Sequence, residues 1–236
     1  MTSSSDLTPN RMRDAGPPLG PVAAVFVLLF LAGLYPVTIF GGRPFFPGPW
    51  ESADTIVTFF QERSTAVLIC AALHFGAAIP LGIFTASVVS RLQFLGVRAA
   101  GATIALFGGF ATAFTMLASS SVLWTLAQPG IAQDRTLVHA FYWVDQVLGG
   151  SGFSVPFGLL IAGVAVPAAS SKLLPKWIVV TGLGLAVCGE LSWLNLVTPR
   201  ALFLVPLTRF LGFAWLIAAG FALPNTVERR GRAASA

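Results

Sequence analysis

Apolar runs of about 20 residues recur along this 236-residue chain and constrain its fold more than any other feature. A helix of that length is what a chain needs to cross the hydrocarbon core of a bilayer. Apolar residues make up 56% of the sequence and charged residues only 10%, against about 25% in soluble domains. Membrane barrels alternate apolar and polar residues instead, and no such alternation is found in this sequence. The pattern predicts an all-α integral membrane helical bundle.

Six segments are long and apolar enough to span a membrane. They are predicted at about residues 21–40, 65–89, 98–127, 153–167, 176–196 and 200–223. The fourth begins earlier, at Thr136, and is interrupted at Gly149–Gly152. Its first half is predicted to be an amphipathic helix at the membrane interface, with an apolar face of Leu137, Phe141, Val144 and Leu148. Residues 1–20 are predicted to be a disordered lead-in, 21–224 the six-helix transmembrane domain and 225–236 a basic tail.

Basic residues near the span ends predict the orientation, because cytoplasmic loops carry an excess of Lys and Arg. With the N-terminus inside, the inner side collects Arg11, Arg13, Arg91, Arg98, Lys172, Lys176, Arg229, Arg230 and Arg232. The outer side keeps Arg43, Arg63, Arg135 and Arg200. Both termini are therefore predicted to be cytoplasmic.

Two opposite charges, Glu190 and Arg209, lie inside the last two apolar segments. Burying either one alone in hydrocarbon is costly. Each lies about nine residues from the predicted turn near Thr198, so the helical rise places them at one depth. We expect them to pair. The pair can be an ion pair that locks the two helices together or part of a ligand site.

Other polar side chains lie at similar depths and predict a pocket that opens outward. The ligand-binding candidates are Glu190, Arg209, His74, Ser119, Ser120 and Ser121. Outer-rim candidates are His139, Tyr142 and Asp145. Each has a plainer interpretation: the histidine can bond between helices, the serines can bond to their own helix, and Asp145 can face water.

The residue types of the spans argue against a cofactor, a metal site, catalysis and nucleic-acid binding. The two histidines differ in depth, so paired haem ligation is not expected, and no metal cluster is found on any span. One of the serines 119–121 could face His74, but these serines lack the sequence of a nucleophile elbow, so no enzyme is predicted.

Basic residues are scattered along the chain, which argues against nucleic-acid binding. Cys70 and Cys188 fall in apolar spans and are interpreted as small core residues. No cofactor or metal is predicted.

Small residues recur every four positions in the third span, at Gly101, Ala105, Gly109 and Ala113. Such a stripe lets another helix approach closely. The partner is expected to be a helix of the same chain, and a homodimer through this stripe is the alternative.

Two short stretches carry a family resemblance. Residues 171–182 (SKLLPKWIVVTG) resemble the inner loop that leads into the fifth span of a group of uncharacterised bacterial six-span membrane proteins, described only as a domain of unknown function. Residues 213–221 (FAWLIAAGF) are similar to their last span, and the long fourth helix with a Gly-rich middle also fits. The resemblance covers about residues 20–224. It implies a six-helix bundle in a bacterial inner membrane and implies no activity.

These observations together predict a non-catalytic multi-pass protein of the inner membrane. It is expected to bind a small anionic molecule or lipid in an outer-leaflet pocket, where Arg209 suits a carboxylate or an anionic headgroup, or to scaffold a partner protein. The alternative is a secondary transporter with Glu190 as its coupling acid.

Overall fold

The computed structural model describes residues 11–228, and most of them are helical. The helices are α1 (Leu19–Leu34), α2 (Ala53–Glu62), α3 (Ser64–Phe94), α4 (Gly101–Leu126), α5 (Pro129–Ala132), α6 (Arg135–Gly149), α7 (Ser151–Ser170), α8 (Lys176–Leu191) and α9 (Leu204–Ala222). Short 3-10 turns are η1 (Tyr35–Val37), η2 (Ile39–Gly41), η3 (Ser192–Leu196) and η4 (Pro199–Phe203). Six segments are long and apolar enough to cross a membrane, which confirms the predicted all-α membrane bundle.

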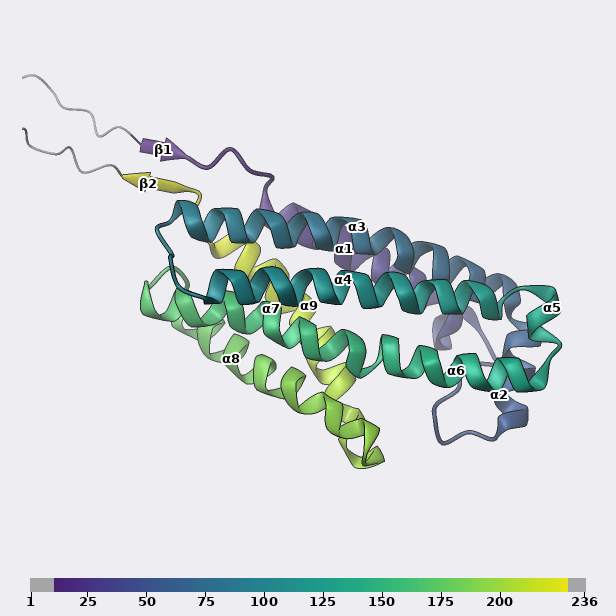
Figure 1. Cartoon of the computed structure of the whole chain (residues 1–236). Coiled ribbons are helices and arrows are strands. Elements are labelled where there is room, and N and C mark those ends of the chain that lie inside the picture. The colour runs from purple at the N-terminus through teal and green to yellow at the C-terminus, as the bar shows by residue number, and fades with distance from the viewer. Residues whose placement is uncertain (1–10, 229–236) are drawn as a thin grey trace, which may run out of the picture.

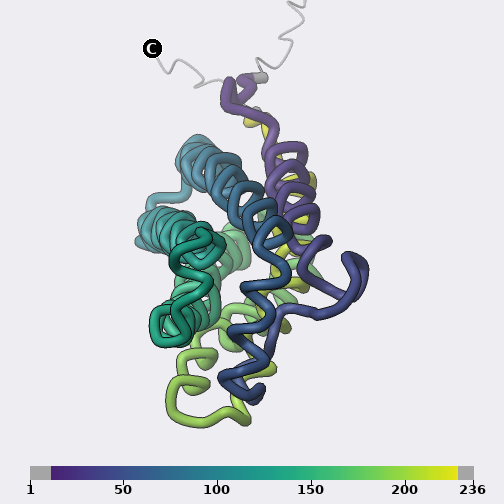
Figure 2. The backbone as a smooth tube through the Cα atoms, turned by 90° about the vertical axis from the view of Figure 1, so that its right-hand side faces the viewer, coloured from purple at the N-terminus to yellow at the C-terminus, as the bar shows by residue number. Residues whose placement is uncertain are grey.

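The long helices run side by side in one elongated bundle (Figure 1). Helix α4 packs between α3 and α7, α7 packs on α8, and α9 lies against α1, α7 and α8. The first and last described elements, β1 (Arg11–Arg13) and β2 (Thr226–Glu228), lie at one end, here called the terminal end. The opposite end, here called the lid end, carries α2 and α5 (Figures 1 and 2). The basic-residue pattern predicts that the lid end faces outward.

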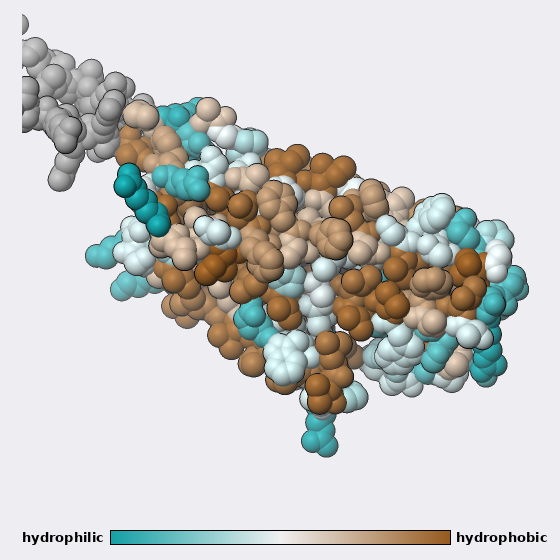
Figure 3. All heavy atoms as spheres, in the orientation of Figure 1, coloured by the Kyte–Doolittle hydropathy of each residue, from teal (hydrophilic) through white to brown (hydrophobic). Residues whose placement is uncertain are grey.

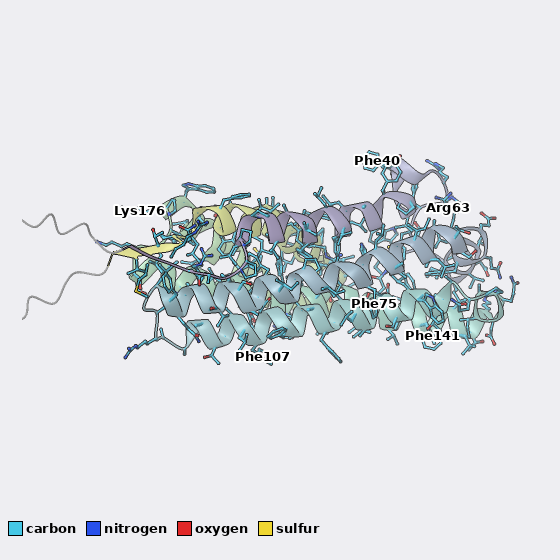
Figure 4. The ribbon with its side chains drawn as sticks, turned by 90° about the horizontal axis from the view of Figure 1, so that it is seen from above. Phe40, Arg63, Phe75, Phe107, Phe141 and Lys176 are labelled. Carbon is cyan, nitrogen blue, oxygen red and sulfur yellow. The ribbon has the colours of Figure 1, made fainter. Side chains whose placement is uncertain are left out.

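On the face seen in Figure 3, apolar side chains cover most of the length of the bundle, and hydrophilic residues gather toward its two ends. Phe75 and Phe107 lie along the middle of the bundle (Figure 4), with 47% and 66% of their surface exposed. Exposed apolar surface of this extent would be unstable in water but is favourable against lipid chains. The bundle is therefore a multi-pass membrane domain in contact with the bilayer.

The small-residue stripe of α4 is covered within the chain. A Cβ at Gly163 of α7 would lie 2.4 Å from the backbone nitrogen of Ala105, and one at Gly109 would lie 2.2 Å from Oγ1 of Thr85 on α3. Ala105 has no exposed surface and Ala113 is also buried. These positions let helix backbones approach closely, as the intrachain interpretation expects. A homodimer through the stripe is therefore wrong, because α3 and α7 already occupy it.

The terminal end is closed by a short two-stranded sheet. Strand β1 (Arg11–Arg13) pairs antiparallel with β2 (Thr226–Glu228). Asp14 forms an ion pair with Arg91 of α3, and both side chains are almost fully buried. The prediction of disorder over residues 1–20 does not hold for residues 11–20, because this pairing orders them. Residues 1–10, and 229–236 of the predicted tail, lie outside the described residues.

The lid end is held by aromatic packing. Ser52 caps α2 by accepting a hydrogen bond of 3.1 Å from the Thr55 backbone. Phe59 and Phe60 of α2 pack edge-to-face on one another, 5.2 Å between ring centroids, and Phe60 reaches the Tyr142 ring of α6. Helix α2 and the loop before it therefore form a lid over the end of the bundle.

Candidate binding cavity

The fourth membrane segment is broken between α6 and α7, at the predicted glycine cluster. Helix α6 ends at Gly149 and α7 begins at Ser151. The two halves remain roughly in line beside α4 (Figure 1), so α6 does not lie flat in the membrane interface. A break in a spanning helix leaves backbone carbonyls without helical partners, and a membrane protein must satisfy them inside the bundle.

The polar side of α6 faces the interior of the protein, where a helix at the membrane interface is expected to turn it toward water. Its apolar residues Leu137 and Val144 are 38% and 45% exposed, whereas Tyr142 and Asp145 are buried. The interpretation of Asp145 as facing water is therefore wrong. The reason is the solvent: lipid accepts the apolar side of α6, so the polar side turns toward the protein.

A cavity of about 210 Å³ lies within the lid half, beside the break. Residues from α1, α3, α4, α6, α7 and α9 converge on it. Its lining consists of Phe30, Leu34, Val37, Thr38, Phe46, Cys70, His74, Met116, Ser119, Ser120, Leu123, Asp145, Gln146, Gly149, Gly150, Phe153, Leu202, Val205 and Arg209. Four of the six predicted ligand-binding residues are among them: Arg209, His74, Ser119 and Ser120. The cavity is thus largely apolar, with a few polar groups converging on it, as small-molecule sites are.

Arg209 enters this cavity from α9. Its Nη2 donates a hydrogen bond to the carbonyl of Gly149, one of the last carbonyls of α6. The guanidinium carbon lies 5.0 Å from the ring centre of Phe153 and 5.7 Å from that of Phe30. These contacts stabilise the cation through the helix terminus and two ring faces. Nε is buried without a hydrogen-bond partner, so the donor capacity of the guanidinium is not used up.

Asp145 supplies a second charge to the same cavity. Its Oδ1 accepts a hydrogen bond of 2.6 Å from Ser119 Oγ. Asp145 and Arg209 lie near enough to interact electrostatically but form no ion pair within residues 11–228. In a site with few water molecules, opposite charges attract more strongly than they do in bulk water. Asp145 is therefore an acidic side chain that shares the cavity with Arg209.

His74 links α3 to α1 through its ring. Its Nε2 donates to the Phe30 carbonyl over 3.0 Å, and its Nδ1 lies 3.7 Å from the Cys70 sulfur. The imidazole also stacks on the Phe30 ring, with 4.1 Å between centroids. A ring with both nitrogens engaged has little left to offer a ligand. Its plainer interpretation, a hydrogen bonder between helices, fits these contacts.

The three serines divide into different roles. Ser119 bonds to Asp145, whereas Ser120 donates over 2.7 Å to the Met116 carbonyl of its own helix. Ser121 likewise donates to the Leu117 carbonyl, over 2.9 Å, and is exposed on the far side of α4. Only Ser119 holds a charged group of the cavity, and Ser121 does not line it.

Glu190 does not pair with Arg209, and that prediction is wrong. Glu190 lies outside the cavity lining, half-buried, and its Oε1 is buried without a hydrogen-bond partner. Its neighbour Gly189 faces Gly158 of α7, where a Cβ would lie 2.8 Å from the Gly158 Cα. Equal depth in the membrane is not enough for two side chains to meet. The helical rise sets the depth of a residue, but contact also requires that both side chains point toward each other around their helix axes.

The three outer-rim candidates lie at different places relative to the cavity. Tyr142 is buried and its hydroxyl donates a 2.9 Å hydrogen bond to the Pro47 carbonyl, so it fastens the lid. His139 is only part-buried and accepts from Trp143 Nε1 over 3.3 Å, away from the cavity lining. Of the three, only Asp145 lines the cavity.

Sequence reasoning missed the aromatic cage and the Gly149 carbonyl. Phe30 and Phe153 look like ordinary apolar residues in their spans, so no signal identified them. The inward side of α6 did have a signal: Tyr142, Asp145, Gln146 and Gly149 follow the i, i+3, i+4, i+7 spacing of one helix face. A narrow polar stripe on a membrane helix indicates the side that faces protein.

Comparison with protein-family models, with curated proteins and with solved structures gives no match to this chain. The six spans of the resemblance are present, and the comparisons assign the chain to no family. Within residues 11–228, no three His, Cys, Asp or Glu side chains converge in the manner of metal ligands.

Proposed function

We propose that this membrane protein binds a small anionic group, a carboxylate or phosphate, at Arg209 in the lid-half cavity. The observation that carries the proposal is the guanidinium itself: it is part-buried at the cavity, lies against the rings of Phe30 and Phe153, and has a buried Nε without a hydrogen-bond partner. Planar guanidinium donors match the oxygen geometry of carboxylates and phosphates. The proposed role is binding without catalysis.

The cavity also supplies groups that offset the positive charge of Arg209. Before an anion binds, Asp145 and the Gly149 carbonyl offset the charge of Arg209. An anion that approaches Arg209 is repelled by Asp145 at the same time. Removing the Asp145 charge should therefore strengthen anion binding, while removing the Arg209 charge should abolish it.

The test is native mass spectrometry of protein purified gently from its own membrane, beside Arg209→Gln. We expect a discrete additional mass in the wild type that Arg209→Gln loses and Asp145→Asn retains at higher occupancy. Glu190→Gln is the matched control, because Glu190 lies outside the cavity lining, and it should behave as the wild type. Equal occupancy in the wild type and Arg209→Gln would refute the proposal.

Secondary transport is a second candidate, favoured by the helix break beside the cavity. Discontinuous helices commonly form the substrate sites of transporters. The sequence predicts Glu190 as coupling acid, and its buried, unpartnered Oε1 is consistent with a group that exchanges a proton. Proteoliposomes carrying an imposed proton gradient test this: accumulation of the ligand found above should occur with the wild type and not with Glu190→Gln. Accumulation unchanged in that variant would remove Glu190 from the mechanism.

A further inference from the structure

A second cavity adjoins the first one at the lid end. It measures about 550 Å³, lies between α6 and the turn that joins α8 to α9, and is called the groove below. Its lining is Pro49, Trp50, Trp143, Asn195, Pro199, Arg200, Leu202, Phe203 and Pro206. Leu202 also lines the Arg209 cavity, so this one side chain borders both spaces.

The backbone leaves room for this groove because α6 does not pack along α9. Helix α6 packs instead on α4, α7 and α2. The turn between α8 and α9 diverges from α6, visible from the side and from the lid end (Figures 1 and 2), and the surface is notched between them (Figure 3). The groove therefore opens sideways from the bundle.

An aromatic cluster borders the Arg209 cavity toward the lid end. Phe46 lines the Arg209 cavity and packs on Phe59, Phe60 and Tyr142, with ring centroids 5.5 to 6.2 Å apart. Phe59, Phe60 and Tyr142 are each at most 1% exposed. These rings and the Tyr142–Pro47 hydrogen bond hinder entry to the cavity from the lid end.

The lining of the groove suits the membrane interface. Trp50 and Phe203 are 76% and 63% exposed, and tryptophan is enriched where lipid headgroups meet hydrocarbon. Arg200 supplies a positive charge beside these rings. A groove with aromatic walls and one cation attracts a molecule that has both an apolar chain and an anionic head.

We infer that the ligand of Arg209 is an anionic amphiphile, which enters sideways from the lid-end leaflet past Leu202. Its anionic head lies on Arg209 and its chain extends through the groove between Trp143 and Phe203. This inference rests on the proposed function and adds the class of ligand and its route. A cavity of about 210 Å³ holds the head and a few carbons, and the adjoining groove of about 550 Å³ holds more of the chain.

The experiment compares two carboxylates that differ only in their chain. Radiolabelled oleate and radiolabelled propionate are titrated onto the full-length protein in phosphatidylcholine nanodiscs, with empty nanodiscs subtracted. We expect saturable oleate binding, at least tenfold tighter than propionate binding. Arg209→Gln should weaken oleate binding at least tenfold.

Two variants test the route itself. Leu202→Trp fills the junction of the two spaces and should weaken oleate binding at least tenfold. Leu207→Trp adds the same bulk on α9 in a different groove, on the α8 side, and should leave binding unchanged. Because a large side chain can impair folding, Leu202→Phe is measured as well, and each variant must keep the wild-type elution profile in size exclusion.

The outcomes separate the two proposals. Propionate bound as tightly as oleate, with loss in Arg209→Gln, would overturn the amphiphile inference and keep the proposed function. Oleate binding untouched by both Leu202 variants would overturn the sideways route. Loss in Arg200→Gln without loss in Arg209→Gln would place the head at the groove mouth and overturn both proposals. No saturable binding of either acid would also count against both.

Discussion

The two halves of the bundle are built on opposite principles. In the terminal half, α4 and α7 meet through glycine and alanine, and a Cβ at Gly163 would fall within 2.6 Å of two backbone atoms. In the lid half, the helices separate around a cavity of about 210 Å³ that holds Arg209 and Asp145. The terminal half gains stability from close helix contact, whereas the lid half has less contact around a largely apolar cavity that holds two charged side chains.

The largest expected effect breaks the packed half. Gly163→Val should lower the free energy of unfolding by about 3 kcal/mol, because the added side chain clashes with the α4 backbone at Ala105 and Gly101. Gly76→Val is the matched control on α3, since a Cβ there meets nothing within 4 Å. Unfolding in mixed micelles measures both. Equal losses in the two variants would show that the α4–α7 contact is not what holds the half together.

The next effect concerns the charges of the lid half. A double-mutant cycle of Arg209→Gln and Asp145→Asn should give a coupling free energy of about 1–2 kcal/mol, because the two charges share one poorly solvated cavity. The cycle of Arg209→Gln with Glu190→Gln should be additive to within about 0.5 kcal/mol. Unfolding titrations of the single and double variants supply both values. Stronger coupling to Glu190 than to Asp145 would show that Glu190 offsets the charge of Arg209.

The same contrast explains what the sequence could and could not predict. Length and apolarity identify six spans, and the glycines at 149–152 mark the helix break, because these depend on local composition. The four-residue stripe that includes Gly101 predicted close packing for the same reason. Which faces meet is set by the rotation of each helix among its neighbours. The sequence therefore predicts Arg209 as a site residue, but it places Asp145 at the rim and pairs Arg209 with Glu190, which lies outside the cavity.

A smaller effect should come from the lid. Tyr142→Phe keeps the ring that packs on Phe46 and Phe60 but removes the hydroxyl that donates to Pro47. The variant also removes the acceptor of the 2.8 Å hydrogen bond that Gln146 Nε2 donates. We expect a loss of about 1 kcal/mol, the lower end of what two hydrogen bonds contribute together. Hydrogen exchange should show faster opening of the 42–52 loop than in the wild type, with no change in α7. Faster exchange throughout the bundle would show instead that Tyr142 supports the whole fold.

The smallest effect should come from an ion pair at the same end. Arg135 Nη1 lies 2.6 Å from Asp54 Oδ1 and joins α6 to α2, but the two side chains are 63% and 75% exposed. Water and salt screen such a pair, so Asp54→Asn should cost less than about 0.5 kcal/mol of unfolding free energy. Its short distance is thus a poor guide to its contribution, whereas the fully buried rings of Phe60 and Tyr142 contribute through burial and packing. Unfolding measured at low and high salt decides the matter: a loss above 1 kcal/mol that disappears in salt would make electrostatics, and not aromatic packing, the force that closes the lid.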